Sequence, residues 1–237
     1  MVVKTLNINE NPLADYGNII CGDRFVGRKS EVAKIHNRVL GKSSGNISVI
    51  GLPRIGKSSL VWQALLADRD ENKNCKTFIT RLDLGEFDNS HDLFSAIVAY
   101  VHDELYEYLD EPLKLKIEKT ILDISDQNIR NQEKKRNIQK FFKIVKANKF
   151  KIIIILDEFD HIKAFFKLED FQFLRELSIH PDTKVVFVTI SRRTIQEIEL
   201  ENGTISTLAG VFSNLFLAPF NSADLIDYWE VLEILGV

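Results

Sequence analysis

Two glycines, a lysine and a serine stand in a fixed pattern within residues 49–60 (VIGLPRIGKSSL), directly behind an apolar run. Glycines let a loop fold around a phosphate, so that backbone N–H groups and the positive end of the following helix point at the anion. The lysine is then expected to contact the β- and γ-phosphates, and the first serine to offer its hydroxyl to Mg²⁺. The predicted nucleotide-binding residues are Gly51, Leu52, Pro53, Arg54, Ile55, Gly56, Lys57, Ser58 and Ser59, with Ser58 as the metal ligand.

An acidic cluster ends the most apolar stretch of the chain, residues 149–160 (KFKIIIILDEFD). Cleavage of a nucleotide requires a ligand for the metal ion and a group that orients or deprotonates water. We expect Asp157 to hold Mg²⁺ through its bound water and Glu158 to act on the attacking water, with Asp160 supporting them. An acid after a strand can also be only a helix cap. The combination with the glycine loop therefore favours hydrolysis of a bound nucleotide.

Polar and cationic residues end a third apolar stretch, residues 184–193 (KVVFVTISRR). We expect Thr189 to position water and Arg192 to neutralise the charge that develops on the γ-phosphate. Ser191 and Arg193 would emerge at the same place. Two adjacent cations after a strand can equally form a solvated loop, and the sequence leaves this alternative open.

The elements that must position these residues alternate between strands and helices. The isoleucine run of residues 152–155 is continuous rather than alternating, which is typical of a strand covered on both faces in a parallel sheet. In such α/β sheets ligands bind at the carboxyl ends of the strands. The expected strands are 47–51, 76–84, 149–160, 184–193 and 214–220, and the expected helices are 29–41, 57–69, two or three within 90–148, and 168–178.

The composition of the 237-residue chain is that of an ordinary globular protein. A net charge of −3 gives no electrostatic case for nucleic acid or a membrane surface as the main partner, although it does not exclude nucleic acid. Cys21 and Cys75 have no metal-ligand spacing. The N-terminus lacks the apolar core of a signal peptide, and the longest apolar run is too short to cross a bilayer. We therefore expect a cytoplasmic protein.

The order of these elements resembles that of a known class of P-loop ATPases. One predicted strand lies between the phosphate-loop strand and the strand that ends in Asp157 and Glu158. This resembles the additional-strand, catalytic-glutamate division, in which a sensor strand, here 184–193, lies between those two in the sheet. The resemblance implies an α/β P-loop fold with a mostly parallel five-stranded sheet flanked by helices.

Residues 11–35 are similar to the segment that precedes the first helix in AAA+ and STAND ATPases. Their F-x-G-R-x-x-E signature reads FVGRKSE at residues 25–31. In those families the segment packs against adenine, which implies that Ile19, Ile20, Phe25 and Val26 contact the base. An ordinary hydrophobic lead into the first helix is the alternative.

Two further stretches resemble the STAND group within these families. The T-x-S-R at residues 189–192 looks like the STAND sensor, which implies that Arg192 reaches the γ-phosphate. Residues 212–229 (FSNLFLAPFNSADLIDYW) resemble the passage from the core sheet to a helical lid. The implied organisation is an adenine-contacting segment in 1–24, an ATPase core in 25–220 and the start of a helical lid in 221–237, which we expect to continue in a longer protein.

The leading functional hypothesis is a switch module that binds and hydrolyses ATP with Mg²⁺. Its partners would be ATP and ADP, together with a second copy or an effector region outside this chain, and a signalling or defence role is implied by resemblance only. ATP is favoured over GTP because no N-K-x-D motif follows the acidic cluster.

The alternative hypothesis is a DNA-linked AAA+ ATPase of the replication-initiator or transposition-helper type. Its only local basic footprint would be Lys134, Lys135 and Arg136. A small-molecule kinase is disfavoured because Glu158 beside Asp157 suits water as the acceptor. A protein that binds ATP and keeps it uncleaved is the remaining reading.

Overall fold

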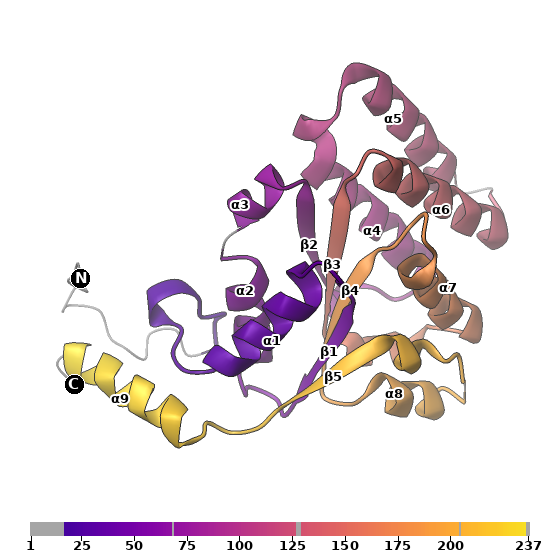
Figure 1. Ribbon diagram of the computed structural model, residues 1–237. Coiled ribbons are helices and arrows are strands. Elements are labelled where there is room, and N and C mark those ends of the chain that lie inside the picture. Colours follow the sequence, from indigo (N-terminus) through magenta and orange to yellow (C-terminus); the bar gives the residue numbers. More distant parts are fainter. Residues whose placement is uncertain (1–16, 68, 127–128, 204, 236–237) are drawn as a thin grey trace.

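The computed structural model describes residues 17–67, 69–126, 129–203 and 205–235 and contains one five-stranded parallel sheet (Figure 1). The order of the strands across the sheet is β2-β3-β4-β1-β5. The predicted α/β fold is therefore confirmed, with β4 between the phosphate-loop strand and the acidic strand as expected. The strands are β1 (Asn46–Gly51), β2 (Thr77–Asp83), β3 (Lys151–Asp157), β4 (Val186–Ser191) and β5 (Phe212–Leu217).

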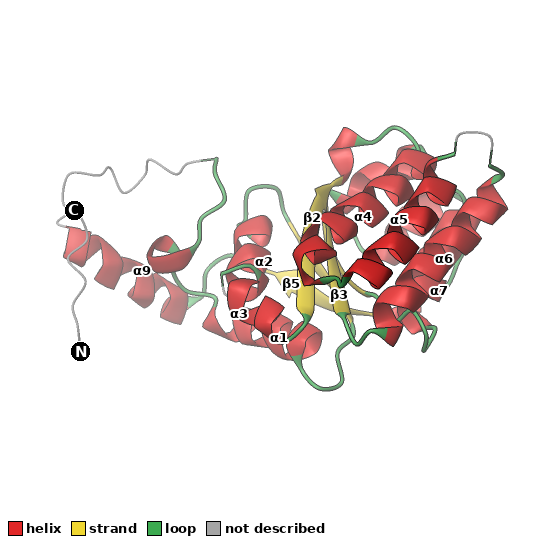
Figure 2. Ribbon diagram, turned by 90° about the horizontal axis from the view of Figure 1, so that it is seen from above, coloured by secondary structure: helices red, strands yellow, loops and turns green. Residues whose placement is uncertain are grey.

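Helices cover both faces of the sheet. Figures 1 and 2 show α1 to α3 on one side and α4 to α7 on the other. The segment between β2 and β3 holds three helices, at the upper end of the two or three expected. The helices are α1 (Lys29–Leu40), α2 (Lys57–Leu65), α3 (Arg69–Asn74), α4 (Ser90–Leu105), α5 (Glu111–Ser125), α6 (Asn131–Ala147), α7 (Leu168–Ile179), α8 (Ile195–Glu201) and α9 (Ser222–Leu235).

Strand β3 is buried on both faces, which explains its unbroken apolar sequence. Ile152, Ile154 and Leu156 belong to the core cluster under α4 to α7. Ile153 and Ile155 belong to the cluster under α1 and α2. Because successive side chains of a strand point to opposite faces, a strand between two helical layers must be apolar at every position.

The register of the parallel strands brings their carboxyl ends to one edge of the sheet. Asp83 of β2 pairs with Asp157 of β3, and Ile50 of β1 pairs with Ser191 of β4. The loop after β1, the acids after β3 and the polar residues after β4 therefore meet at this edge.

Helix α9 extends away from the sheet, and its first turn contacts the segment before α1 (Figures 1 and 2). Asp224 Oδ1 accepts a hydrogen bond of 2.7 Å from the backbone N–H of Arg28. Gly27 lies beside it with a positive φ of 70°, and a Cβ there would come within 2.9 Å of the Asp224 side chain. Most of the predicted segment 1–24 lies outside the described residues. None of the helices in the described ranges combines the length and apolarity required to cross a membrane.

Candidate nucleotide-binding site

The loop between β1 and α2 has the backbone shape that its glycines permit. Gly56, the residue before α2, has φ of 92°, a left-handed conformation that residues with a side chain rarely adopt. Gly51 is required for a different reason, because a Cβ there would lie 3.0 Å from the carbonyl oxygen of Leu217 and 3.1 Å from Ile55. The first glycine therefore gives space to the neighbouring strand β5, and the second allows the turn into the helix.

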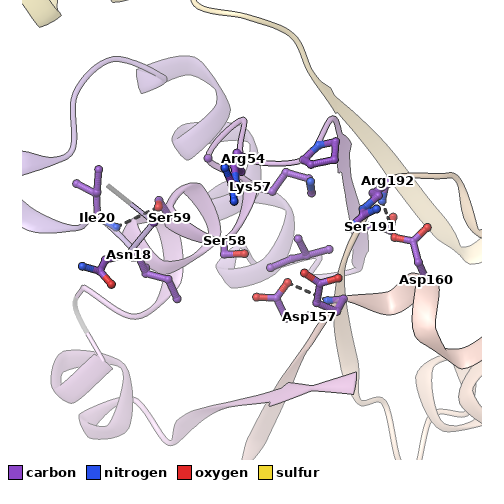
Figure 3. A pocket seen from close by; sticks show the side chains of 16 residues that line it. Asn18, Ile20, Arg54, Lys57, Ser58, Ser59, Asp157, Asp160, Ser191 and Arg192 are labelled. Atoms are coloured by element: carbon purple, nitrogen blue, oxygen red, sulfur yellow. Dashed lines mark hydrogen bonds between the residues drawn. The ribbon is translucent and has the colours of Figure 1, made fainter. Parts of the chain in front are cut away.

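A cavity of about 530 Å³ opens at this edge of the sheet (Figure 3). Its walls come from four segments: the residues before α1, the phosphate loop with the first turn of α2, the end of β3, and the end of β4. This volume lies within the usual range for small-ligand sites. Ile19, expected to contact the base together with Ile20, lines this cavity rather than the smaller one described below. The predicted site residues that line the larger cavity are Ile19, Ile20, Pro53, Arg54, Gly56, Lys57, Ser58, Ser59, Asp157, Glu158, Asp160, Ser191 and Arg192.

Lys57 is held within the loop by its own backbone. Its Nζ donates hydrogen bonds of 2.9 Å to the carbonyl oxygens of Gly51 and Leu52. Partial burial lowers the pKa of Lys57, although Glu158 and Asp160 oppose the shift. Gly51 and Leu52 themselves lie outside the cavity wall and contribute these carbonyl groups. The cation thus lies close to the position where a bound phosphate would need it.

The two acids after β3 differ in exposure. The side chain of Asp157 is 5% exposed, and its Oδ1 accepts a hydrogen bond from the backbone N–H of Glu158. Glu158 has a positive φ of 54°, and its exposed side chain lies 3.7 Å from His161 Nε2. A fixed carboxylate and an accessible carboxylate therefore lie side by side in the cavity wall, as the proposed division between metal ligand and base requires.

Asp160 contacts both arginines after β4, but through different groups of each. Its Oδ1 accepts a hydrogen bond of 3.0 Å from Arg193 Nε, and its Oδ2 accepts one of 2.7 Å from the backbone N–H of Arg192. Arg193 also pairs with Glu201 of α8. Arg193 is therefore tied to the protein, whereas the Arg192 side chain lines the cavity (Figure 3).

Thr189 lies away from the position that the sequence suggested. Its side chain is fully buried, and its Oγ1 donates a hydrogen bond of 2.8 Å to Ser48 Oγ within the sheet. Ser191 lines the cavity in its place, with its Oγ bonded to the Arg193 carbonyl. Thr189 lies two residues before Ser191 in β4, away from the edge of the sheet, and its hydroxyl joins β4 to β1. The predicted contact with water at the γ-phosphate does not fit this position.

A smaller cavity of about 180 Å³ adjoins the first, and both are lined by Ile20, Gly56 and Ser59. Phe25 and Val26 line it, as expected for residues that contact a base, and Ile55 of the loop lines it as well. Sequence reasoning missed Phe220 and Tyr228, which close the cavity from the side of α9. The sequence signal that could have indicated them is the resemblance of residues 212–229 to the passage into a helical lid. The lining is mostly apolar, with Arg24 and Arg28 as its cations, and the apolar part suits the flat face of a purine.

The donor atoms fit a magnesium–nucleotide complex. A hydroxyl oxygen from Ser58 and a carboxylate from Asp157 line the same cavity, and oxygen is the ligand that Mg²⁺ prefers. Backbone N–H groups at the start of α2 suit the phosphates. Ser58 and Asp157 would hold the metal, whose positive charge would partly neutralise the negative charge of the phosphates.

Comparison with solved structures finds proteins of similar fold. The Aeropyrum pernix ORC1 protein in complex with DNA has a TM-score of 0.58 at 14% identity, over 93% of this chain and 51% of that chain. The Aeropyrum pernix ORC2 protein, in ADPNP and ADP complexes, has a TM-score of 0.60 at 13% identity, over 91% and 54%. A Walker-type ATPase of Pyrococcus abyssi has a TM-score of 0.53 at 12% identity, over 88% and 58%.

These identities are low, so the likeness concerns the fold alone. This chain spans about half the length of the solved structures that it matches. A search of curated proteins gives no match. The sequence itself matches the AAA domain family over residues 40–198, from the end of α1 through the phosphate loop, the acidic strand and β4 into α8. The chain therefore belongs to the AAA domain family.

Proposed function

We propose that this chain binds ATP with Mg²⁺, hydrolyses it, and couples the bound nucleotide to the position of α9. The observation that carries the proposal is that one cavity collects the phosphate loop, Lys57, Asp157, Glu158 and Arg192. A neighbouring, mostly apolar cavity reaches Phe220, just before α9, and Tyr228 within it. The phosphates, the metal ion and the attacking water would thus bind in the larger cavity, and the adenine in the smaller one.

The residues divide the chemistry among them. The loop N–H groups and Lys57 bind the phosphates, with the Lys57 ammonium exchanging the Gly51 and Leu52 carbonyl groups for phosphate oxygens. Glu158 accepts a proton from the water that attacks the γ-phosphorus. Arg192 stabilises the negative charge that develops on the leaving and transferred groups.

Substitution of two residues tests this division. Lys57→Ala is expected to weaken nucleotide binding, because the phosphates lose a charged partner. Glu158→Gln is expected to retain binding and to lower turnover by about 10²- to 10⁴-fold, the usual contribution of a general base. Nucleotide affinity and released phosphate are measured separately, and the exposed α6 residues provide the controls Lys140→Ala and Glu133→Gln.

Several outcomes would contradict the proposal. Undiminished turnover in Glu158→Gln would remove Glu158 from the role of base. A phosphorylated product in place of free phosphate would indicate a kinase. Tightly retained ATP or ADP without turnover in the unmodified protein would indicate a binding switch rather than an enzyme.

For the biological role, the DNA-linked reading has more support than the signalling switch. Its support is the likeness of this fold to part of the Aeropyrum pernix ORC1 and ORC2 proteins and of Cdc6p from Pyrobaculum aerophilum, the last with a TM-score of 0.54 at 11% identity. The structure of the first holds DNA. We therefore propose a DNA-linked AAA ATPase, with the STAND-type switch as the alternative.

The cations of the basic run in α6 are largely engaged by other groups of the protein. Lys134 is buried, and its Nζ lies 2.7 Å from His91 Nε2. Lys135 Nζ is hydrogen-bonded to Asp170 and to the Glu169 carbonyl. Two of the three cations are thus engaged within the protein, so this run is a weak basis for contact with DNA.

Duplex DNA separates the two roles. A DNA-linked enzyme is expected to show faster ATP hydrolysis with DNA at low salt, and the effect should fall as salt rises because phosphate contacts are screened. A switch of the STAND type is expected to show no response to DNA. No binding and no stimulation at low salt would therefore reject the DNA-linked role.

A further inference from the structure

The carboxylate of Asp157 has a cationic partner that the chemistry described above does not use. Arg81 of β2 donates to Asp157 Oδ2 through Nη2 at 2.7 Å and through Nε at 3.2 Å. The Asp157 side chain is 5% exposed and that of Arg81 is 30% exposed. A carboxylate so well buried is costly unless it is paired. Arg81 provides that pairing.

The register of the sheet fixes this contact. Arg81 pairs across the strands with Ile155, two positions before Asp157. Side chains two residues apart share a face of a strand. Ile79 and Ile155 face the core under α1 and α2, so Arg81 and Asp157 lie on that same face, next to the phosphate-loop helix.

Asp157 is also held by a group other than Arg81. Asp157 Oδ1 is already held by the backbone N–H of Glu158 at 2.9 Å, a bond that does not depend on Arg81. The hydrogen bonds of Lys57 go to the carbonyl groups of Gly51 and Leu52. Within the described part of the chain, Arg81 is thus the cation that hydrogen-bonds this carboxylate.

We propose that Arg81 is the counter-ion of Asp157 before the metal arrives, and that its charge weakens the binding of Mg²⁺ at this position. The inference rests on the proposed function, in which Asp157 holds the metal. A guanidinium and a divalent cation are attracted to the same carboxylate and repel each other. The site then has a low affinity for Mg²⁺ alone and binds Mg²⁺ together with a nucleotide, whose negative charge offsets that of Arg81.

Manganese binding tests the effect of this charge directly. Mn²⁺ affinity is measured by electron paramagnetic resonance in the presence of saturating ADP. Arg81→Met removes the charge and keeps an unbranched side chain, and we expect it to bind Mn²⁺ about tenfold more tightly. Arg81→Lys keeps the charge and should remain near the unmodified protein. Equal or weaker Mn²⁺ binding in an Arg81→Met protein that binds ADP would overturn the inference.

A stability cycle tests the pairing without nucleotide or metal. In EDTA, Arg81→Met should lower the melting temperature, because it leaves the Asp157 carboxylate unpaired. In the Asp157→Asn background the same substitution should lower the melting temperature much less. An equal cost in both backgrounds would reject Arg81 as the counter-ion. Failure of the unmodified protein to bind ADP and Mn²⁺ would instead reject the proposed function, together with the metal part of the inference.

Discussion

Arg192 and Arg193 are neighbours in the sequence but make different contacts. The Arg192 side chain lines the cavity, whereas Arg193 pairs with Asp160 and Glu201. We expect Arg192→Ala to lower turnover by about 100-fold, as the loss of one group that stabilises transition-state charge does. Arg193→Ala should instead lower the melting temperature by about 2–4 °C, the shift for about 1 kcal/mol in a chain of this size.

Steady-state phosphate release and thermal unfolding of both variants separate these effects. Each arginine serves as the control for the other, since both lie in one loop and carry the same charge. A large loss of turnover in Arg193→Ala at an unchanged melting temperature would show that the two roles had been exchanged.

Sequence spacing identified some residues of the site better than others. Gly56, Lys57 and Ser58 could be placed because backbone conformation and phosphate chemistry both constrain a short continuous pattern. Thr189 could not, because alternation along a strand gives the face of a residue but not its depth in the sheet. Arg81 gave no signal, because its partner lies 76 positions away and only the strand register joins them.

At the scale of elements, the buried strands were the most predictable part. An isoleucine run such as that of β3 is possible only where both faces are covered, so the sequence alone indicated a parallel sheet between helices. The contribution of Phe220 and Tyr228 to the smaller cavity was not predictable in the same way. It depends on the direction in which α9 leaves the sheet, which a local pattern does not determine.

Asp224 joins the first turn of α9 to the segment before α1. Its carboxylate accepts hydrogen bonds from the backbone N–H groups of Arg28 and Asn221. We expect Asp224→Ala to release α9 and to increase hydrogen exchange in its first turns. Asp227→Ala removes only the exposed ion pair with Lys29 and is the matched control. Exchange in Asp224→Ala equal to that of the unmodified protein would mean that Asp224 does not dock the helix.

The docking of α9 should also persist in moderate acid. Burial favours the neutral form of Asp224, but the hydrogen bonds from Arg28 and Asn221 outweigh it and lower the pKa below its ordinary value. A group of this kind stabilises the fold above its unfolded pKa of about 3.9, and this stability is lost as the pH falls through the lower folded pKa. The protection factors of the α9 amides, which compare the observed exchange with its intrinsic rate at each pH, should therefore be unchanged from pH 7 to about pH 5.

At the scale of the whole molecule, the site joins segments that are far apart in the sequence. The phosphate loop, the ends of β3 and β4, and the segment before α1 share one cavity, and a second cavity extends it to α9. A nucleotide that fills both would contact the core and α9 together. It can shift the position of α9 only to the extent that it binds the docked arrangement more tightly than the released one.

The same arrangement predicts whether one copy is sufficient for hydrolysis. Lys57, Arg192 and the two acids line the cavity from a single chain. The basal rate per subunit should therefore be constant over about a hundredfold range of protein concentration, because no mass-action step supplies a missing group. The rate is measured as phosphate release at fixed saturating ATP, and the Arg192→Ala variant gives the rate of a site that lacks this group. A rate per subunit that rises with concentration would contradict this expectation, because it would mean that a second copy completes the site.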